Sequence, residues 1–258
     1  MIFDTHAHYD ASQFDADRDA VLSALPESGV GLVIDPGCEA PSSRLAVELA
    51  ERYSHVYAAV GWHPEEWESW DSASLPLLRE LTKHPRVVAV GEIGLDYYWD
   101  KEHKALQREM FERQICLALE RDLPVIVHDR EAHEDSLETV LCYPELRGVF
   151  HCYSGSAEMA KELLRRGWYL GFDGPVTYKN NKKAAEVLAV TPMDRILVET
   201  DSPYMAPEPV RGRRNDSRNL PYILARIAGL KGVTAEEMER VTWDNGCRLF
   251  GISPAGMR

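Results

Sequence analysis

The sequence predicts an α/β protein that folds as a single (β/α)8 barrel, the TIM-barrel architecture. Eight short apolar runs rich in β-branched residues alternate with longer amphipathic segments along 258 residues. This alternation implies parallel strands joined by right-handed helical crossovers, and eight such units in about 250 residues are typical of a closed barrel. A doubly wound open sheet would be favoured by a glycine-rich loop after the first strand, but the first glycine is Gly29. We therefore expect one domain over residues 1–258.

Each predicted strand is a run of apolar residues, and each predicted helix repeats its apolar residues every three to four positions. The strands are expected at 2–8, 30–36, 56–61, 87–94, 125–128, 149–152, 168–172 and 196–200. The helices are expected near 17–25, 42–53, 73–83, 104–121, 133–142, 156–166, 181–189, 218–229 and 235–249. The segment 104–121 shows the clearest periodicity, because Phe111, Ile115 and Leu119 recur every four residues.

Composition and charge exclude several classes of protein. Hydrophobic residues make up 45% of the chain and charged residues 28%, which argues against a disordered chain. The net charge is −13, so a surface-wide basic field for duplex DNA is not expected, although a metal or a few arginines could still bind a small phosphate. No apolar run is long enough to span a bilayer. Five scattered cysteines and the lack of a basic, apolar leader favour a reducing cytoplasm.

Histidine and carboxylate side chains stand at the carboxyl ends of the predicted strands. In chain order they are His6, His8, His63, Glu92, His128, His151, Glu199 and Asp201. The carboxyl ends of barrel strands converge on one face, where active sites lie. The two-residue period of a strand further places His6 with His8, and Glu199 with Asp201, on the same side.

This set of side chains indicates a metal site. Imidazoles and carboxylates gathered among apolar strands would be costly to bury without partners, and a pair of divalent cations would satisfy them together. Nitrogen and oxygen donors without thiolates suit Zn, Mn, Fe or Mg. A lone histidine at a strand end is more often a core or loop residue. The hypothesis of a metal site therefore rests on the whole set of side chains, each at a strand end and in chain order. The remaining histidines, which we expect on the solvated surface, are His55, His84, His103 and His133.

Six motifs occur in order at the predicted strand ends. They are D-T-H-A-H from Asp4, G-W-H-P from Gly61, G-E-I-G-L-D-Y-Y from Gly91, V-H-D-R-E-A from Val127, H-C-Y-S-G from His151 and E-T-D-S-P-Y from Glu199. With these motifs the sequence resembles the TatD family of metal-dependent hydrolases, a branch of the amidohydrolase-like barrels, from Asp4 to near Phe250. The resemblance implies hydrolysis of phosphodiesters, as a deoxyribonuclease with 3′ exonuclease action on single-stranded DNA.

The resemblance also implies roles for individual residues. Two divalent ions (Mg, Mn or Zn) would be bound, with Glu92 bridging them. The first ion would take His6, His8, Glu92 and Asp201, and the second Glu92, His128 and His151. Asp201 would orient the attacking hydroxide and take its proton, and Glu199 would support a ligand or bind a third ion. His63, Arg130 and Arg214 are expected to contact the substrate phosphate.

Basic residues follow the seventh and eighth predicted strands, where barrels often bind phosphate. They are Lys179, Lys182, Lys183, Arg211, Arg213 and Arg214. They would either contact substrate or form a solvated rim. The expected partner is single-stranded DNA or a smaller phosphodiester, with no membrane and no obligate protein partner.

Other functions stay open at this point. The same barrel serves hydrolases of cyclic amides and lactones, which often use a carbamylated lysine as the metal bridge. Glu92 stands in the predicted fourth strand, which contains no lysine, and this favours phosphodiester chemistry. A small phosphoester could replace DNA as substrate, since a fold does not dictate its ligand. A catalytically silent, metal-binding scaffold is the alternative outside enzymes.

Overall fold

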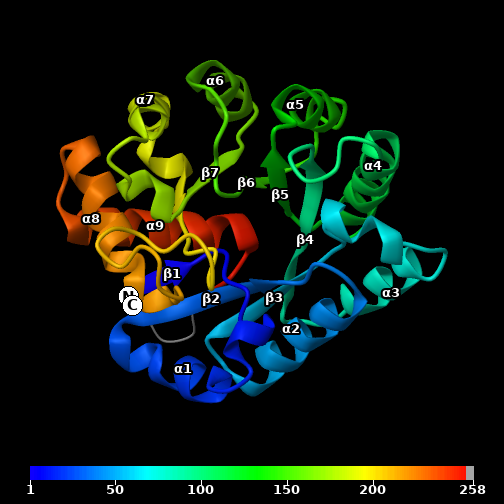
Figure 1. The fold of residues 1–258 in the computed structure, drawn as a ribbon, viewed down its shortest axis with the longest axis horizontal. Helices are drawn as coiled ribbons and strands as arrows, with labels where there is room; N and C mark the ends of the chain where they lie inside the picture. The colour runs from blue at the N-terminus through cyan, green and yellow to red at the C-terminus, as the bar shows by residue number, and fades with distance from the viewer. Residues whose placement is uncertain (254–258) are drawn as a thin grey trace.

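The computed structural model describes residues 1–253 and confirms the (β/α)8 barrel. Eight parallel strands follow one another around a single sheet in chain order, with helices outside them (Figure 1). The strands are β1 (Ile2–Asp4), β2 (Val30–Pro36), β3 (Val56–Val60), β4 (Val87–Asp96), β5 (Val125–Arg130), β6 (Gly148–Phe150), β7 (Tyr169–Phe172) and β8 (Ile196–Val198).

All the predicted helices are present within residues 1–253. They are α1 (Arg18–Ala24), α2 (Ala40–Arg52), α3 (Ser74–Leu81), α4 (Lys104–Glu120), α5 (His133–Leu141), α6 (Ala157–Arg165), α7 (Lys182–Val190), α8 (Leu220–Lys231) and α9 (Ala235–Phe250). Short 3-10 helices occupy several loops, among them η3 (Pro64–Ser69) and η4 (Gly174–Thr177).

The barrel closes between the segments that follow β1 and β8. The amide of Asp201 donates to the carbonyl of His6 (2.9 Å), and the amide of His8 donates to the carbonyl of Ser202 (2.7 Å). Buried Asp4 accepts hydrogen bonds from the amide (3.0 Å) and the hydroxyl (2.7 Å) of Thr200. These contacts form the seam at which the barrel closes. The seam therefore lies in the same segments that carry the predicted metal ligands.

Three strands end where the chain turns toward the site, so their predicted bounds were too long. β1 ends at Asp4, β8 at Val198 and β6 at Phe150. Beyond β8, Asp201 has a φ of 54°, a left-handed conformation that a regular strand does not allow. β4 and β5, in contrast, continue past their predicted ends, to Asp96 and Arg130.

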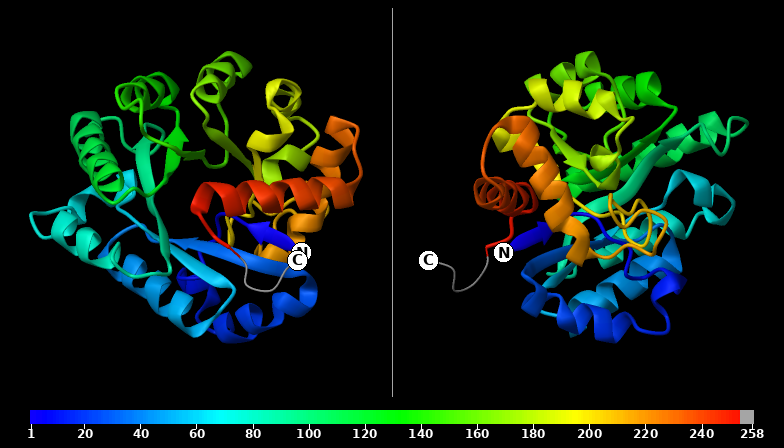
Figure 2. Two further views of the ribbon diagram at one scale, coloured as in Figure 1. Left: turned by 180° about the vertical axis from the view of Figure 1, so that it is seen from behind. Right: turned by 60° about the vertical axis from the view of Figure 1, so that its left-hand side comes forward.

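The apolar core has two layers. The larger lies between the strands and the surrounding helices, and the smaller fills the barrel, where Phe3, Ile34 and Ile126 meet Phe250 of α9. In Figure 2 α9, in red, lies beside β1, in blue. A Cβ at Gly246 of α9 would lie 2.5 Å from the Phe3 ring, so a glycine lets the helix approach this closely. Helix α9 thus packs over the inner core while the polar site occupies the carboxyl ends of the strands.

None of the helices within residues 1–253 is both long and apolar enough to cross a membrane.

Candidate metal centre

Glu92 is aimed into the barrel rim by an irregularity in β4. Val90 pairs with Val125, but Ile93 pairs with Val127, so β4 contains one residue more than β5 across this step. Such a bulge re-aims the side chains next to it. The amide of Glu92 leaves the ladder and donates to the carbonyl of Gly37 (3.0 Å). The Glu92 side chain is buried as a result, with its carboxylate at the centre of the predicted ligands.

Each carboxylate oxygen of Glu92 faces its own pair of histidines. Oε2 lies 3.3 Å from His6 Nε2 and 3.4 Å from His8 Nε2. Oε1 lies 2.7 Å from His151 Nε2 and 2.8 Å from His128 Nδ1. These five residues lie close together, and the two oxygens divide the four histidines into two groups.

The first group contains His6, His8 and Asp201. The two Nε2 atoms lie only 3.0 Å apart, and Asp201 Oδ1 lies 3.7 Å from His6 Nε2 and 3.6 Å from His8 Nε2. His8 Nδ1 faces the carbonyl of Pro36 at 3.1 Å, which favours a proton on Nδ1 and a lone pair on Nε2. Lone pairs that converge with carboxylate oxygens form a site for a cation.

The second group is oriented by Asp96, which the sequence analysis did not single out. His128 Nδ1 lies 3.4 Å from His151 Nε2, and the other ring nitrogen of His128 lies 2.9 Å from Asp96 Oδ2. Asp96 is buried and its Oδ1 accepts the amides of Tyr98 and Trp99, both at 2.9 Å. The carboxylate therefore favours a proton on Nε2 and leaves Nδ1 free to bind a metal. A signal was available, because Asp96 lies four residues after Glu92 in the same motif.

Glu199 lies behind His151. Its Oε1 is 3.6 Å from His151 Nδ1 and 2.5 Å from the amide of Cys152, and its Oε2 accepts the hydroxyl of Thr5 (3.2 Å). A Cβ at Gly171 would lie 2.5 Å from Glu199 Oε1, so only glycine leaves room for this carboxylate. Glu199 is fully buried and supports His151 from the side away from Glu92.

His63 also lies beside Glu92, but it presents an N–H to the carboxylate instead of a lone pair. Its Nε2 lies 3.5 Å from Glu92 Oε1, while its Nδ1 accepts the amide of Glu65 at 3.2 Å. The proton therefore resides on Nε2, which makes His63 a hydrogen-bond donor in this arrangement. Burial, together with the neighbouring charge of His128, lowers the pKa of His63 to about 4. The ring is neutral at pH 7.

The two predicted arginines differ in their surroundings. Arg130 is exposed, and its guanidinium carbon lies 4.0 Å from the ring centre of Tyr98. Arg214 was expected to contact the substrate phosphate, but its two terminal nitrogens bind the carboxylate of Asp17 at 2.8 and 2.6 Å. It also lies over the Phe14 ring, 4.6 Å from the centre. Arg214 would have to leave this pair in order to bind a phosphate.

The four remaining histidines are half-buried, so they stand at the surface but are also covered in part by neighbouring side chains. His84 and His133 pair with Glu51 (3.0 Å) and Asp129 (2.8 Å). His103 stacks on Trp67 with 3.8 Å between ring centres. His55 packs edge-on against Tyr53. These partners explain their partial burial, and none of the four rings belongs to the Glu92 cluster.

The electrostatics favour an ionised Glu92. Burial alone would raise its pKa, but the charge of His151 and the hydrogen bond from His128 hold the pKa of Glu92 well below its usual value. Burial would lower the pKa of His128, yet its hydrogen bonds to Asp96 and Glu92 raise it to about 9. When no cation is bound, protonated histidines therefore balance the negative charge of the buried carboxylates.

The donors fit divalent metal ions. The ligand atoms of His6, His8 and Glu92 lie within 4.8 Å of one another, as do those of Glu92, His128 and His151. Two further groups, His6–His151–Glu199 and His63–Glu65–His128, meet the same limit. Buried His6 Nδ1 and His151 Nδ1 have no hydrogen-bond partner among the described residues. Imidazole nitrogens and carboxylate oxygens around open coordination positions are typical of catalytic sites.

Comparison with known proteins identifies the family. A family model described as TatD related DNase matches residues 3–251. The chain belongs to the TatD family. It is therefore a metal-dependent hydrolase by family, and the resemblance read from the six motifs is confirmed.

Individual TatD relatives extend over the whole chain. An uncharacterized metal-dependent hydrolase of Bacillus subtilis, YabD, is 43% identical and aligns with 98% of this chain and all of its own. A protein of Cronobacter sakazakii named 3'-5' ssDNA/RNA exonuclease TatD is 35% identical over 98% of this chain and all of its own. The crystal structure of the TatD homologue YjjV from Escherichia coli superposes with a TM-score of 0.92 at 32% identity, covering 98% of each chain.

Proposed function

We propose that this TatD-family hydrolase is a phosphodiesterase that removes nucleotides from the 3′ end of single-stranded DNA. The observation that carries the proposal is the division of the Glu92 carboxylate between two pairs of histidines. Relatives named as 3'-5' ssDNA/RNA exonucleases, at 34% and 35% identity over the full chain, support this substrate class. The five free cysteines support a reducing, cytoplasmic setting.

The residues would hold two divalent ions. His6, His8, Glu92 and Asp201 would bind the first, and Glu92, His128 and His151 would bind the second. Such ions, when bound, supply a nucleophile at neutral pH and neutralise charge on the phosphoryl oxygens. Mg, Mn and Zn all suit this donor set, since availability rather than affinity alone selects among them.

Asp201 would accept the proton of the attacking water. Burial alone would raise its pKa, but the neighbouring protonated His8 and His151 keep the pKa of Asp201 below its ordinary value. Its side chain is 16% exposed, compared with 4% for Glu92 and 0% for Glu199, so substrate and water can reach it. An ionised carboxylate that water can reach is able to accept a proton, which is the role of a general base.

Two further side chains would bind the phosphate. The Nε2–H of His63 faces Glu92 Oε1 across 3.5 Å, a gap wide enough for the donor to turn to a phosphoryl oxygen. Exposed Arg130 follows His128 by two residues and supplies a positive charge at the rim. Once directed at the phosphoryl oxygen, such a donor would stabilise the charge that develops there.

The test is hydrolysis of a single-stranded oligodeoxynucleotide labelled at either end. Wild type and Glu92→Gln are assayed with Mg, Mn or Zn and with chelator, and Glu66→Gln on η3 serves as the matched control. We expect metal-dependent ladders from the 5′-labelled strand and immediate release of the label from the 3′-labelled strand. Both should be lost in Glu92→Gln and kept in Glu66→Gln. Intact strands under every metal would overturn the nuclease, and cleavage of only small esters would confine the enzyme to those.

A further inference from the structure

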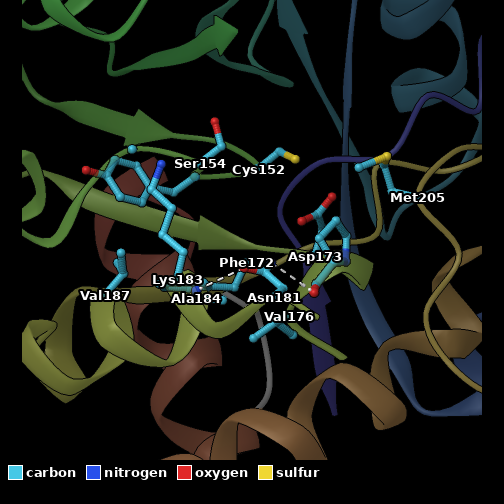
Figure 3. A pocket seen from close by; sticks show the side chains of 13 residues that line it. Cys152, Ser154, Phe172, Asp173, Val176, Asn181, Lys183, Ala184, Val187 and Met205 are labelled. Carbon is cyan, nitrogen blue, oxygen red and sulfur yellow. Dashed lines mark hydrogen bonds between the residues drawn. The ribbon is translucent and has the colours of Figure 1, made fainter. Parts of the chain in front are cut away.

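A cavity of about 240 Å³ opens beside the metal centre, between the loops that follow β6 and β7 (Figure 3). Its walls are mostly apolar, with side chains from Phe172, Val176, Ala184, Val187 and Met205. Whole small-molecule sites measure roughly 300–1,000 Å³. The cavity is therefore sized for one group of a larger ligand, with apolar walls that suit a flat ring.

One buried polar group faces this apolar space. Asp173 is 3% exposed, and its Oδ2 atom is buried without a hydrogen-bond partner among the described residues. Asp173 precedes η4 at the N-cap position, yet its side chain makes no capping hydrogen bond there. Figure 3 shows its carboxylate among the labelled lining residues, directed to the space between Cys152 and Met205. Because a buried acceptor left unpaired is costly, the cavity calls for a ligand that donates an N–H or O–H.

A positive charge stands at the other side of the cavity. Lys183 of α7 is exposed and lines the cavity, and its amine takes part in none of the ion pairs or hydrogen bonds found for residues 1–253. Figure 3 places Lys183 near Ser154 and away from Asp173. The cavity thus offers an acceptor at its buried side and a cation at its rim, where a phosphate or carbonyl oxygen of the ligand could lie.

The cavity and the metal centre share a wall. Cys152, which lines the cavity, directly follows His151, and Met205 on the opposite side lies four residues after Asp201. A phosphodiester held at Glu92 therefore has one of its substituents next to the cavity mouth. In a nucleic acid that substituent is a nucleoside.

We propose that this cavity binds the nucleobase of the nucleotide being cleaved, with Asp173 accepting an N–H of the base. The proposal rests on the phosphodiesterase function above and adds to it a subsite for the base. Thymine, uracil and guanine carry a ring N–H, and cytosine and adenine carry an amino group, so every base can meet Asp173. Lys183 contributes a charge at the rim.

Two chromogenic esters distinguish the contribution of base binding in the cavity from the hydrolysis itself. Thymidine 5′-monophosphate p-nitrophenyl ester carries a base, whereas methyl p-nitrophenyl phosphate does not, and the leaving group is the same. The quantity measured is the ratio of their kcat/KM values. In wild type the ratio should favour the thymidine ester, and Asp173→Leu should lower the ratio about tenfold, the effect of one buried hydrogen bond. Glu186→Leu, on an exposed position of α7, is the matched control and should keep the ratio.

Methylation of the base tests the same contact from the substrate side. The 3-methylthymidine ester lacks the N–H, so wild type should lose about the same factor on it as Asp173→Leu loses on the thymidine ester. Methylation should cause no further loss in the variant, as expected for two changes that remove one interaction. If neither Asp173→Leu nor methylation of the base changes the ratio, while methyl p-nitrophenyl phosphate is still hydrolysed, the base subsite is overturned. The proposed phosphodiesterase function is then unaffected.

A binding measurement tests the cavity when neither ester is hydrolysed. If wild type hydrolyses neither ester with any metal, the proposed function fails, and the cavity is then tested with thymidine alone. Saturation-transfer NMR on the full chain should show thymidine bound to wild type and Glu186→Leu, and weakened by at least about tenfold for Asp173→Leu, or for 3-methylthymidine with wild type. Equal signals in all four would overturn the proposal.

Discussion

Asp96 and His128 form a buried pair in which the aspartate Oδ2 lies 2.9 Å from the imidazole Nε2, on the ring edge opposite Glu92. The carboxylate is itself fixed by the amides of Tyr98 and Trp99. Carboxylates in this position set the tautomer and direction of a metal-binding histidine. Asp96 is therefore placed to position His128 in the candidate metal centre, from the ring edge that faces away from Glu92.

Replacing Asp96 with Asn should weaken metal binding at the second group of donors. The amide can present a donor to His128 Nε2 and so favour a proton on Nδ1, the atom that faces Glu92. Loss of such a partner typically costs 10–100-fold in metal affinity or activity. Calorimetric titration with Zn or Mn measures the effect. Glu112→Gln, on the partly buried surface of α4, is the control, and equal affinities in the three proteins would remove Asp96 from this role.

Glu92→Ala should reduce the content of both metals, because each carboxylate oxygen serves one pair of histidines. Turnover should fall by several orders of magnitude. Elemental analysis of the purified, metal-loaded variant checks the prediction directly. A variant that retains the wild-type metal content would show that Glu92 does not bridge the two groups.

Asp201→Asn should abolish hydrolysis while preserving the fold. The amide keeps the size of the side chain but has no basic oxygen of comparable strength, and proton transfer of this kind contributes about 10²–10⁴-fold. Single-turnover rates and thermal unfolding are compared with wild type. Near-normal turnover in the folded variant would exclude Asp201 as the base.

Metal binding at pH 7 should release protons. The pKa of His128 is about 9 in the metal-free protein, so the ring is protonated at pH 7 and must lose a proton before Nδ1 can bind an ion. Because this proton is lost only as pH approaches the raised pKa of His128, the affinity for metal should increase as pH rises from 7 toward 9 and then level off. Calorimetry in buffers of different ionisation enthalpy counts the protons. A binding enthalpy that is independent of the buffer would contradict the prediction.

Gly171→Ala should destabilise the fold and disturb His151. The new Cβ would lie 2.5 Å from Glu199 Oε1, and this carboxylate is fully buried and held by hydrogen bonds from Cys152 and Thr5. Overpacking of this kind costs about 1–3 kcal/mol. Thermal unfolding of the metal-free protein measures it. Gly229→Ala in α8 is the control, since nothing lies within 4 Å of its Cβ position. Equal losses at both positions would indicate that the space around Glu199 is not the cause.

The convergence of the candidate ligands could be predicted because strand ends locate them. His128 and Glu92 follow apolar runs, and parallel strands bring such positions together. Asp96 was not predicted, because its role depends on which way the His128 ring turns. The ion pair of Arg214 could not be predicted, since its partner Asp17 lies 197 residues away in sequence and no local pattern reveals that pair. Asp173 could not be predicted as a buried, unpaired acceptor, since its surroundings depend on the packing of α7.

The seam between β1 and β8 also has a consequence for biosynthesis. Asp4 and Thr200, which join it, are 196 residues apart in the chain, and the donors His6 and His8 lie on one side of the seam with Asp201 on the other. A ribosome delivers the histidines first and the aspartate only after most of the chain has emerged. A partly made chain can therefore hold fragments of the metal centre but not its first group of donors. The first group of donors is therefore complete only once the segment after β8 has been made and has docked beside the segment after β1.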